Sequence, residues 1–180
     1  MKIAILGWGS LIWEQGSLAR RVRGKWKFGG PELPLEFSRK SPSRDGALTL
    51  VIDSTQGQAS PTRFITSSRR TLKKARLDLK EREGVPSVDC IGYVDVTAAN
   101  SGGATKEILK AIRKWASKMG YEAAIWTALQ SNFDNFTVEQ AVQYLRALPV
   151  RGKRKAKEYI EKAPPEVDTP LRRYVSGVEW

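Results

Sequence analysis

The alternation of apolar and polar positions divides the chain into short strands and a few longer helices. Strands are predicted at short stretches rich in apolar residues, namely at residues 2–6, 35–38, 47–53, 62–66, 88–96 and 123–128. Helices are predicted where apolar residues recur every three or four positions, namely at residues 68–83, 105–119, 137–148 and 153–163. Strands gather early, with helices between and after them. This order favours an α+β fold, built on a mixed sheet or a small β-barrel with packed helices.

The length of the chain and its short apolar runs indicate one cytoplasmic domain. A chain of 180 residues is long enough for a single domain with a substantial core. Its longest apolar runs of about six residues are far below the roughly 20 needed to cross a bilayer, so no membrane partner is expected. The N-terminal residues lack the pattern of a signal peptide. A single cysteine, Cys90, allows no intrachain disulfide, which is typical of a cytoplasmic protein.

The sequence contains no histidine. Its absence excludes Ser-His-Asp and Cys-His nucleophile pairs, HExxH zinc sites and proton shuttles through an imidazole. Because only one cysteine remains as a soft ligand, we expect no zinc site in this chain. Acid–base chemistry must therefore fall mainly to a carboxylate.

The charge of the chain is strongly positive, with 31 Lys and Arg against 19 Asp and Glu, or +12 at pH 7. Such a surface attracts phosphate backbones and other polyanions. The basic residues are densest at residues 69–76 and 151–157. Solvated helix faces are the simpler explanation of both blocks, because no zinc finger, phosphate-binding loop or other nucleic-acid motif accompanies them. Nucleic acid is therefore an alternative partner that no motif supports.

The first predicted strand ends in a tight aromatic turn, GWGSLIW, at residues 7–13. Two glycines flank Trp8, and Ser10 follows. One interpretation is a turn whose tryptophan packs in the core. The other is a loop whose backbone N–H groups face a ligand, with the glycines allowing its close approach.

Glu83 stands near the end of its predicted helix, four residues after the apolar Leu79, so helical periodicity places it on the inward face. It also lies in the last turn, at the negative end of the helix dipole. Burial and the dipole both disfavour the ionised carboxylate, a property that suits a general acid or base near neutral pH. Alternatively, Glu83 turns back to solvent or pairs with Arg82 or Arg76. Glu81 is expected to face outward.

Two stretches carry a resemblance when they are taken together: WGSLIW (residues 8–13) after the N-terminal strand, and REGV (residues 82–85) at the end of a helix. They are similar to the YGS-type loop and to the catalytic glutamate segment of the γ-glutamylcyclotransferase-like superfamily. LPLEFSRKS and LTLVID resemble the strand pair between these motifs in bacterial members. The resemblance covers about residues 2–96. Position 8 is Trp where the family usually has Tyr, and position 11 is Leu where one branch has Asn.

The resemblance implies a single γ-glutamylcyclotransferase-like domain over residues 1–180, with an accessory helical region at about residues 137–180. It also implies a reaction without cofactor or metal, on a small γ-glutamyl substrate. The free α-amine of the γ-glutamyl group attacks its own γ-carbonyl, which yields 5-oxoproline and a free amine or amino acid. Glu83 is then the catalytic acid–base. The substrate-binding residues are then Trp8, Gly9, Ser10, Leu11 and Arg39.

Several alternatives stand beside this interpretation. Trp8 suits core packing as well as substrate contact, and Arg39 suits the capping of a strand edge. The whole chain is alternatively a basic nucleic-acid-binding module, or a catalytically silent, ligand-binding member of the same fold.

Overall fold

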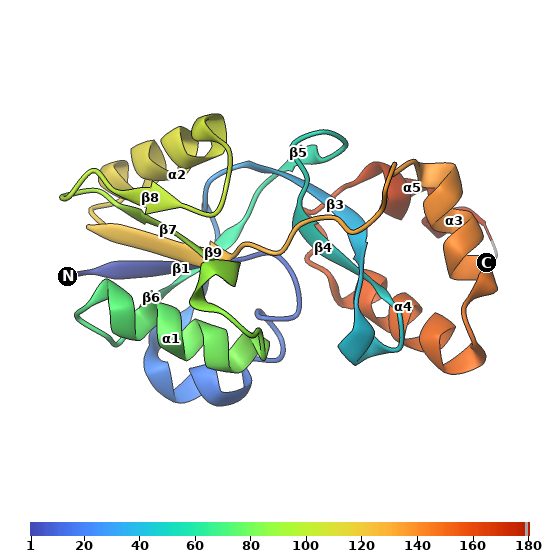
Figure 1. Ribbon diagram of the computed structural model, residues 1–180, viewed down its shortest axis with the longest axis horizontal. Helices are drawn as coiled ribbons and strands as arrows, with labels where there is room; N and C mark the ends of the chain where they lie inside the picture. Colours follow the sequence, from blue (N-terminus) through green and yellow to red (C-terminus); the bar gives the residue numbers. More distant parts are fainter. Residues whose placement is uncertain (179) are drawn as a thin grey trace. The chain divides into compact units, whose positions relative to one another are not determined.

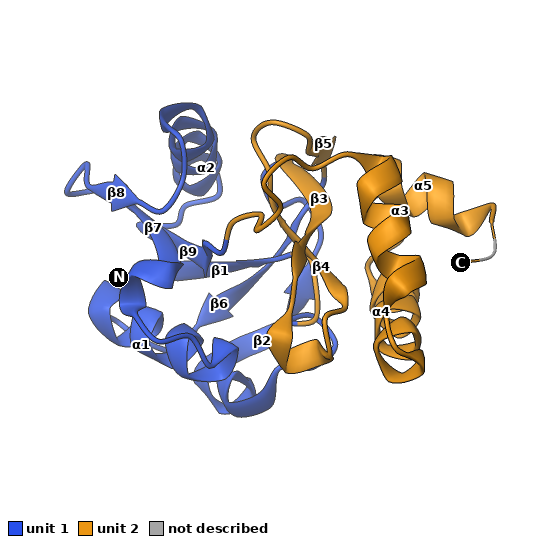
Figure 2. Ribbon diagram, turned by 45° about the vertical axis from the view of Figure 1, so that its right-hand side comes forward, with its two compact units in different colours: residues 1–7, 11–32, 61–129 blue, residues 8–10, 33–60, 130–180 orange. Residues whose placement is uncertain are grey.

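The computed structural model of the chain describes residues 1–178 and 180, and these fall into two compact units. Figure 2 colours the units separately: unit 1 comprises residues 1–7, 11–32 and 61–129, and unit 2 comprises residues 8–10, 33–60 and 130–180. The expectation of a single domain over residues 1–180 stays a prediction.

Unit 1 is built on a six-stranded mixed sheet in which β1 is an inner strand. β1 runs antiparallel to β6 and parallel to β9. Every residue of β1 is buried, as expected for a strand whose two faces are both covered. The order of the strands across the sheet is β2 (Val22–Lys27), β6 (Arg63–Ser67), β1 (Ile3–Gly7), β9 (Ala123–Thr127), β7 (Ile91–Asp95) and β8 (Ser101–Gly102).

Helices cover both faces of this sheet, with α1 on one side and α2 on the other (Figure 1). On the first face, Ala75 and Leu79 of α1 belong to the buried cluster that contains Ile5 of β1. On the second face, the ring of Trp115 in α2 meets Phe64 of β6, with centroids 5.1 Å apart. The helices and 3₁₀ turns of unit 1 are η1 (Gly16–Arg21), α1 (Leu72–Glu83), η3 (Val88–Cys90) and α2 (Lys106–Lys118).

Unit 2 combines a three-stranded antiparallel sheet with three helices. β3 is the central strand, and its Phe37 meets Tyr159 of α4 edge to face, with ring centroids 6.2 Å apart. The elements are β3 (Leu33–Lys40), η2 (Pro42–Arg44), β4 (Leu48–Ile52), β5 (Gln58–Ser60), α3 (Val138–Ala147), α4 (Val150–Lys162) and α5 (Pro170–Ser176).

The α+β class is confirmed, and the larger sheet is mixed as predicted. Within residues 1–178 and 180, neither sheet closes into a barrel. α2 and α3 begin where the sequence indicates, because Thr105 and Thr137 cap them by accepting hydrogen bonds from the N–H groups of Ile108 and Gln140. None of the described helices combines the length and the apolar character that a membrane crossing requires.

Two predicted helix starts are wrong by a few residues. α1 begins at Leu72 rather than near residue 68, because Thr71 is extended and the Arg69 side chain reaches Asp78 in the helix, with Nε 2.6 Å from Oδ2. α4 begins at Val150 rather than at residue 153, directly after Pro149, since proline tolerates a helix start. The strands β2, β5 and β8 and the short helix α5 were not predicted.

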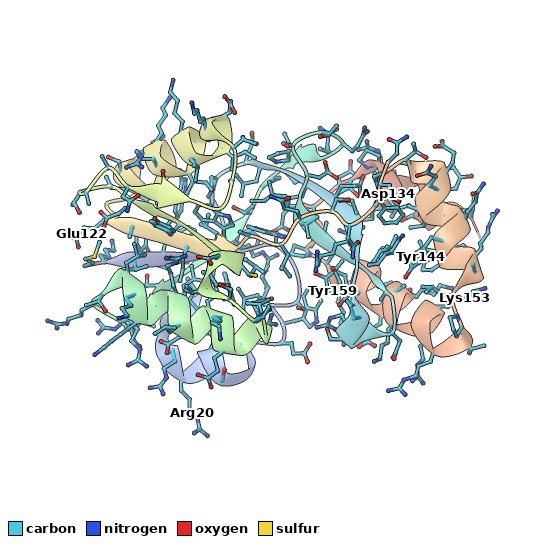
Figure 3. The ribbon with its side chains drawn as sticks, in the orientation of Figure 1. Arg20, Glu122, Asp134, Tyr144, Lys153 and Tyr159 are labelled. Atoms are coloured by element: carbon cyan, nitrogen blue, oxygen red, sulfur yellow. The ribbon has the colours of Figure 1, made fainter. Side chains whose placement is uncertain are left out.

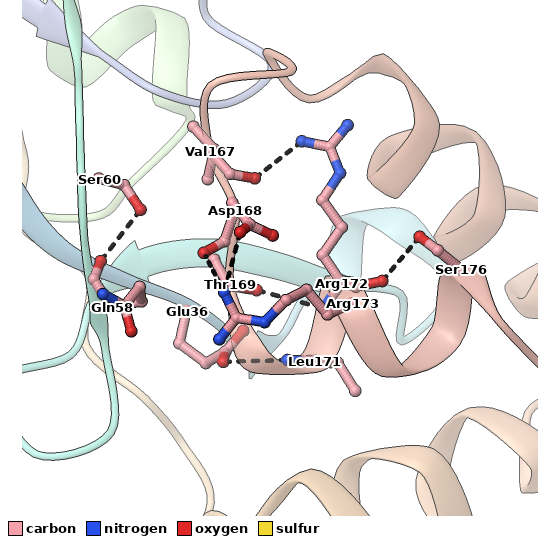
Figure 4. Close-up of polar contacts among 10 residues, drawn as sticks. All are labelled: Glu36, Gln58, Ser60, Val167, Asp168, Thr169, Leu171, Arg172, Arg173 and Ser176. Carbon is pink, nitrogen blue, oxygen red and sulfur yellow. Dashed lines mark hydrogen bonds and ion pairs between the residues drawn. The ribbon is translucent and has the colours of Figure 1, made fainter.

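A buried carboxylate in β3 joins the sheet of unit 2 to its last helix (Figure 4). Glu36 is fully buried, and it accepts hydrogen bonds from the N–H groups of Phe37 at 2.7 Å and Leu171 at 3.3 Å. Burial raises the pKa of the Glu36 carboxyl above its ordinary value, and the charge of Asp53 acts in the same direction. Hydrogen bonds from Thr169 and the two N–H groups oppose this rise without cancelling it.

Glu36→Gln is expected to remove a pH dependence from the free energy of unfolding. Because the pKa is higher in the folded state, the folded protein retains the Glu36 proton over a pH range in which the unfolded chain releases it. The contribution of Glu36 to stability is therefore present below the ordinary carboxyl pKa and is lost as the pH rises through the folded value, by about 1.4 kcal/mol per unit of difference.

Denaturant unfolding of the wild type and of Glu36→Gln, measured from pH 4 to pH 8, tests this expectation. The difference between the two curves isolates Glu36 from the other carboxyl groups. We expect the wild type to lose stability relative to the variant as the pH rises. Curves that stay parallel over the whole range would show that Glu36 does not titrate in this way.

Candidate functional site

The chain leaves β1 through a segment that is divided between the two units. Gly7 ends β1, and the position of a side chain there is occupied, because a Cβ atom on Gly7 would lie 2.7 Å from the Trp26 ring. Leu11 is buried in the cluster of unit 1 that also contains Leu79 of α1. The residues that follow the turn therefore pack on the last turns of α1.

Trp8, Gly9 and Ser10 belong to unit 2. Trp8 is 5% exposed, and its indole Nε1 donates to the carbonyl of Leu50 in β4 at 3.3 Å. A Cβ atom on Gly9 would meet the hydroxyl of Tyr159 far inside contact distance, so only glycine fits at this position. For Trp8, the core-packing interpretation agrees with these contacts.

Glu83 is the last residue of α1, and its side chain is 15% exposed. Its Oε1 lies 2.6 Å from Nη1 of Arg82, whose own side chain is 8% exposed. Gly84 follows with φ +63° in the left-handed region, and its N–H donates to the carbonyl of Glu81 at 3.2 Å. This cap ends the helix at Glu83 and fixes the backbone that carries the carboxylate. Glu81 is exposed, as predicted.

Arg82 also holds the segment that follows the turn. Its Nε donates to the carbonyl of Glu14 at 3.1 Å, and its Nη2 donates to the same oxygen. Gly16 lies beside it, since a Cβ atom there would be 3.8 Å from Cγ of Arg82. One guanidinium therefore joins Glu83 at the end of α1 to the backbone some 68 residues earlier in the chain.

The ion pair of Glu83 with Arg82 is the alternative that the sequence left open for this carboxylate. The helical face was predicted correctly in that the side chain is largely buried. A carboxylate held between helix end and guanidinium has a fixed orientation, which is what a proton-transferring group requires.

Arg39 lies in β3 and forms a contact within unit 2. Its Nη1 donates to the carbonyl of Gln130 at 2.8 Å, so this side chain ties the strand to the segment before α3. Of the predicted site residues, the structure places Leu11 and Glu83 in unit 1. It places Trp8, Gly9, Ser10 and Arg39 in unit 2.

The two basic blocks are partly used in structural contacts. In the first block, Arg69 pairs with Asp78, and Arg76 donates to the carbonyls of Val88 and Ile91. In the second block, α4 carries Arg151 and Lys155, and both of these contact Asp45 in the turn before β4. These contacts leave fewer cations for a nucleic-acid partner than the sequence suggests.

Among the described residues, no three His, Cys, Asp or Glu side chains gather in a way that could hold a metal ion. Cys90 ends η3 and is half-buried, rather than lying within the predicted strand. Comparison of the chain with protein-family models, with curated proteins and with solved structures gave no match.

Gly9→Ala is expected to lower the free energy of unfolding by about 1–3 kcal/mol, the usual cost of overpacking a filled site. The added methyl group meets the Tyr159 hydroxyl, so Tyr159→Phe should recover part of this loss. The remaining ring carbon Cζ is 3.3 Å from the methyl position, which is a tight but tolerable contact. Denaturant unfolding of both single variants and of the double variant gives the coupling energy. Strictly additive losses would contradict the contact.

Proposed function

We propose that this chain is a γ-glutamylcyclotransferase-like enzyme, which cyclises a γ-glutamyl group to 5-oxoproline and releases an amine or amino acid. The observation that carries the proposal is the Arg82 bridge, which fixes the Glu83 carboxylate beside the segment that follows the GWGS turn. Glu83 lies within REGV, and Glu14 directly follows WGSLIW; these two stretches resemble the motifs of that superfamily.

The reaction balances within the substrate and one carboxylate. The α-amine nitrogen forms a bond to the γ-carbonyl carbon, and the bond from that carbon to the leaving nitrogen breaks. Glu83 takes a proton from the α-ammonium and passes it to the leaving nitrogen. The second proton that the α-nitrogen loses as it becomes the ring amide goes by the same carboxylate to the released amine, which leaves as an ammonium, so Glu83 ends in its starting state. The step consumes no water, oxidant or second substrate. Because the nucleophile and the carbonyl are in one molecule, effective molarities of about 10⁵ M or more are available to a correctly folded substrate.

Arg82 acts in this proposal as a positioning residue. It holds one carboxylate oxygen, Oε1, which leaves the other oxygen of Glu83 to exchange protons with the substrate. The N–H groups of Gly9, Ser10 and Leu11 stay the predicted partners of the substrate carboxylate or of the developing oxyanion. Arg39 uses Nη1 for its contact with Gln130, and a guanidinium has five N–H donors, so others remain for a substrate carboxylate.

Replacement of Glu83 by glutamine is expected to lower the rate of 5-oxoproline release by about 10²–10⁴-fold, the usual contribution of a general acid–base. The measurement is 5-oxoproline formed from a panel of γ-glutamyl amines and γ-glutamyl dipeptides. Glu81→Gln is the matched control, because it makes the same change two residues earlier on an exposed face of the same helix.

The control variant should keep the wild-type rate and the wild-type unfolding curve. Wild-type protein that releases no 5-oxoproline from any member of the panel would refute the proposed reaction. An active wild type with an equally active Glu83→Gln variant would refute the role of Glu83 while leaving the reaction intact.

A further inference from the structure

Unit 1 has a second candidate site, a pocket of about 230 Å³ at the end of the sheet where β1 begins and β6 ends. Its position follows from strand register. Thr66 of β6 pairs with Ala4 of β1 on one side and with Arg23 of β2 on the other, so these three residues point to one face of the sheet.

Further polar residues border the pocket from the ends of these strands. Lys2 directly precedes β1, and Ser68 directly follows Ser67, the last residue of β6. Lys2 Nζ lies 4.5 Å from the centre of the Tyr121 ring, and the Tyr121 hydroxyl is 2.7 Å from Oγ1 of Thr66. The lining residues that matter here are Lys2, Arg23, Thr66, Ser67, Ser68 and Arg70.

The positive charge of the pocket is largely uncompensated. Within the described part of the chain, Lys2, Arg23 and Arg70 form no ion pair through their side chains. Arg69 also borders the pocket, but its guanidinium is neutralised by two hydrogen bonds to Asp78. Glu122 is half-exposed; it accepts a hydrogen bond from the backbone N–H of Lys2 at 2.6 Å and lies 3.9 Å from the amino group of Met1. Lys2, Arg23 and Arg70 therefore border the pocket with no carboxylate paired to their side chains among the described residues.

The hydroxyl groups add directional donors to this charge. Oγ of Ser67 accepts a hydrogen bond from the N–H of Arg69 at 3.1 Å, which leaves its own proton to donate elsewhere. The hydroxyl of Ser68 has no hydrogen-bond partner among the described residues. Arginine and lysine with serine or threonine hydroxyls form the donor set that proteins use for phosphate oxygens.

The size of the pocket limits its ligand. A volume of about 230 Å³ is below the roughly 300–1,000 Å³ of sites that enclose a drug-sized molecule. It is several times the volume of about 30 Å³ that one water molecule takes in the liquid. A single phosphate group therefore fits, and the rest of its molecule extends into solvent.

We propose that this pocket binds the terminal phosphate group of a phosphate monoester through Arg23, Lys2 and Arg70, with the hydroxyls of Ser67 and Ser68 as further donors. The site is in unit 1 and uses none of the residues assigned to the cyclisation reaction. The proposed phosphate site accounts for part of the net charge of +12.

Isothermal titration of the whole chain with inorganic phosphate, AMP and adenosine at 150 mM salt tests the phosphate requirement. We expect phosphate and AMP to bind saturably and to compete, whereas adenosine should not bind. A 5′-phosphorylated oligonucleotide and its 5′-hydroxyl counterpart then distinguish the two sources of a terminal phosphate. Competition with AMP by the phosphorylated strand alone identifies a nucleic-acid end. Competition by neither strand identifies a small phosphorylated molecule.

Three variants locate the binding. Arg23→Gln removes a charge–phosphate contact and should raise the Kd for AMP about tenfold or more. Ser68→Ala leaves the charge unchanged and should raise the Kd several-fold. Arg20→Gln is the matched control, because Arg20 is exposed in η1, extends away from the ribbon in Figure 3 and does not border the pocket. Its Kd should stay within about twofold of the wild type.

Three outcomes would overturn the proposal. The first is no binding of phosphate or AMP at millimolar concentration by a protein that unfolds normally. The second is an equal loss of affinity in Arg20→Gln and Arg23→Gln, which would assign the attraction to net charge. The third is equal binding of both oligonucleotides that Ser68→Ala leaves unchanged, which would indicate a surface for the nucleic-acid backbone.

Discussion

The proposed site depends on one guanidinium. Arg82 contacts the Glu83 carboxylate with one end and the Glu14 carbonyl with the other, and it is itself almost completely buried. A buried charge is tolerated only when it is paired and hydrogen-bonded, and here both conditions are met by groups from distant parts of the chain. The Arg82 side chain therefore connects the loop after β1 to the end of α1. Loss of either partner would leave the buried guanidinium only partly paired.

The contact between Arg82 and Glu14 is possible because the end of α1 and the segment after β1 both pack on the sheet of unit 1. β1 is buried between β6 and β9, and α1 packs on it through Leu79, one helical turn before Glu83. Leu11 joins the same cluster, so the chain that leaves β1 returns to the helix before it reaches Glu14. The opposite end of β1 borders the basic pocket. One sheet thus supports a carboxylate site at one end of a strand and a cationic pocket at the other.

Local patterns in the sequence predicted the elements whose apolar faces meet the core. α2 followed from the helical spacing of Ile108 and Ile112, and its Thr105 cap was also recognisable. β2 escaped prediction because it is an edge strand with exposed Arg23 and Lys25, so it lacks the apolar alternation of an inner strand. Helical periodicity also predicted that Glu83 lies on the inward face of its helix. It did not give the Arg82 contact with Glu14, because that bond depends on tertiary structure rather than on spacing along one helix.

The central claim is that Arg82 and Glu83 form one ligand-binding site with the segment after β1, and amide NMR tests it directly. Titration of ¹⁵N-labelled protein with 5-oxoproline should shift the amide signals of Leu11 and Ile12 together with those of Glu83 and Gly84, along one common saturation curve. Signals of these residues that remain unchanged at saturating ligand, or that respond with unrelated affinities, would contradict the account.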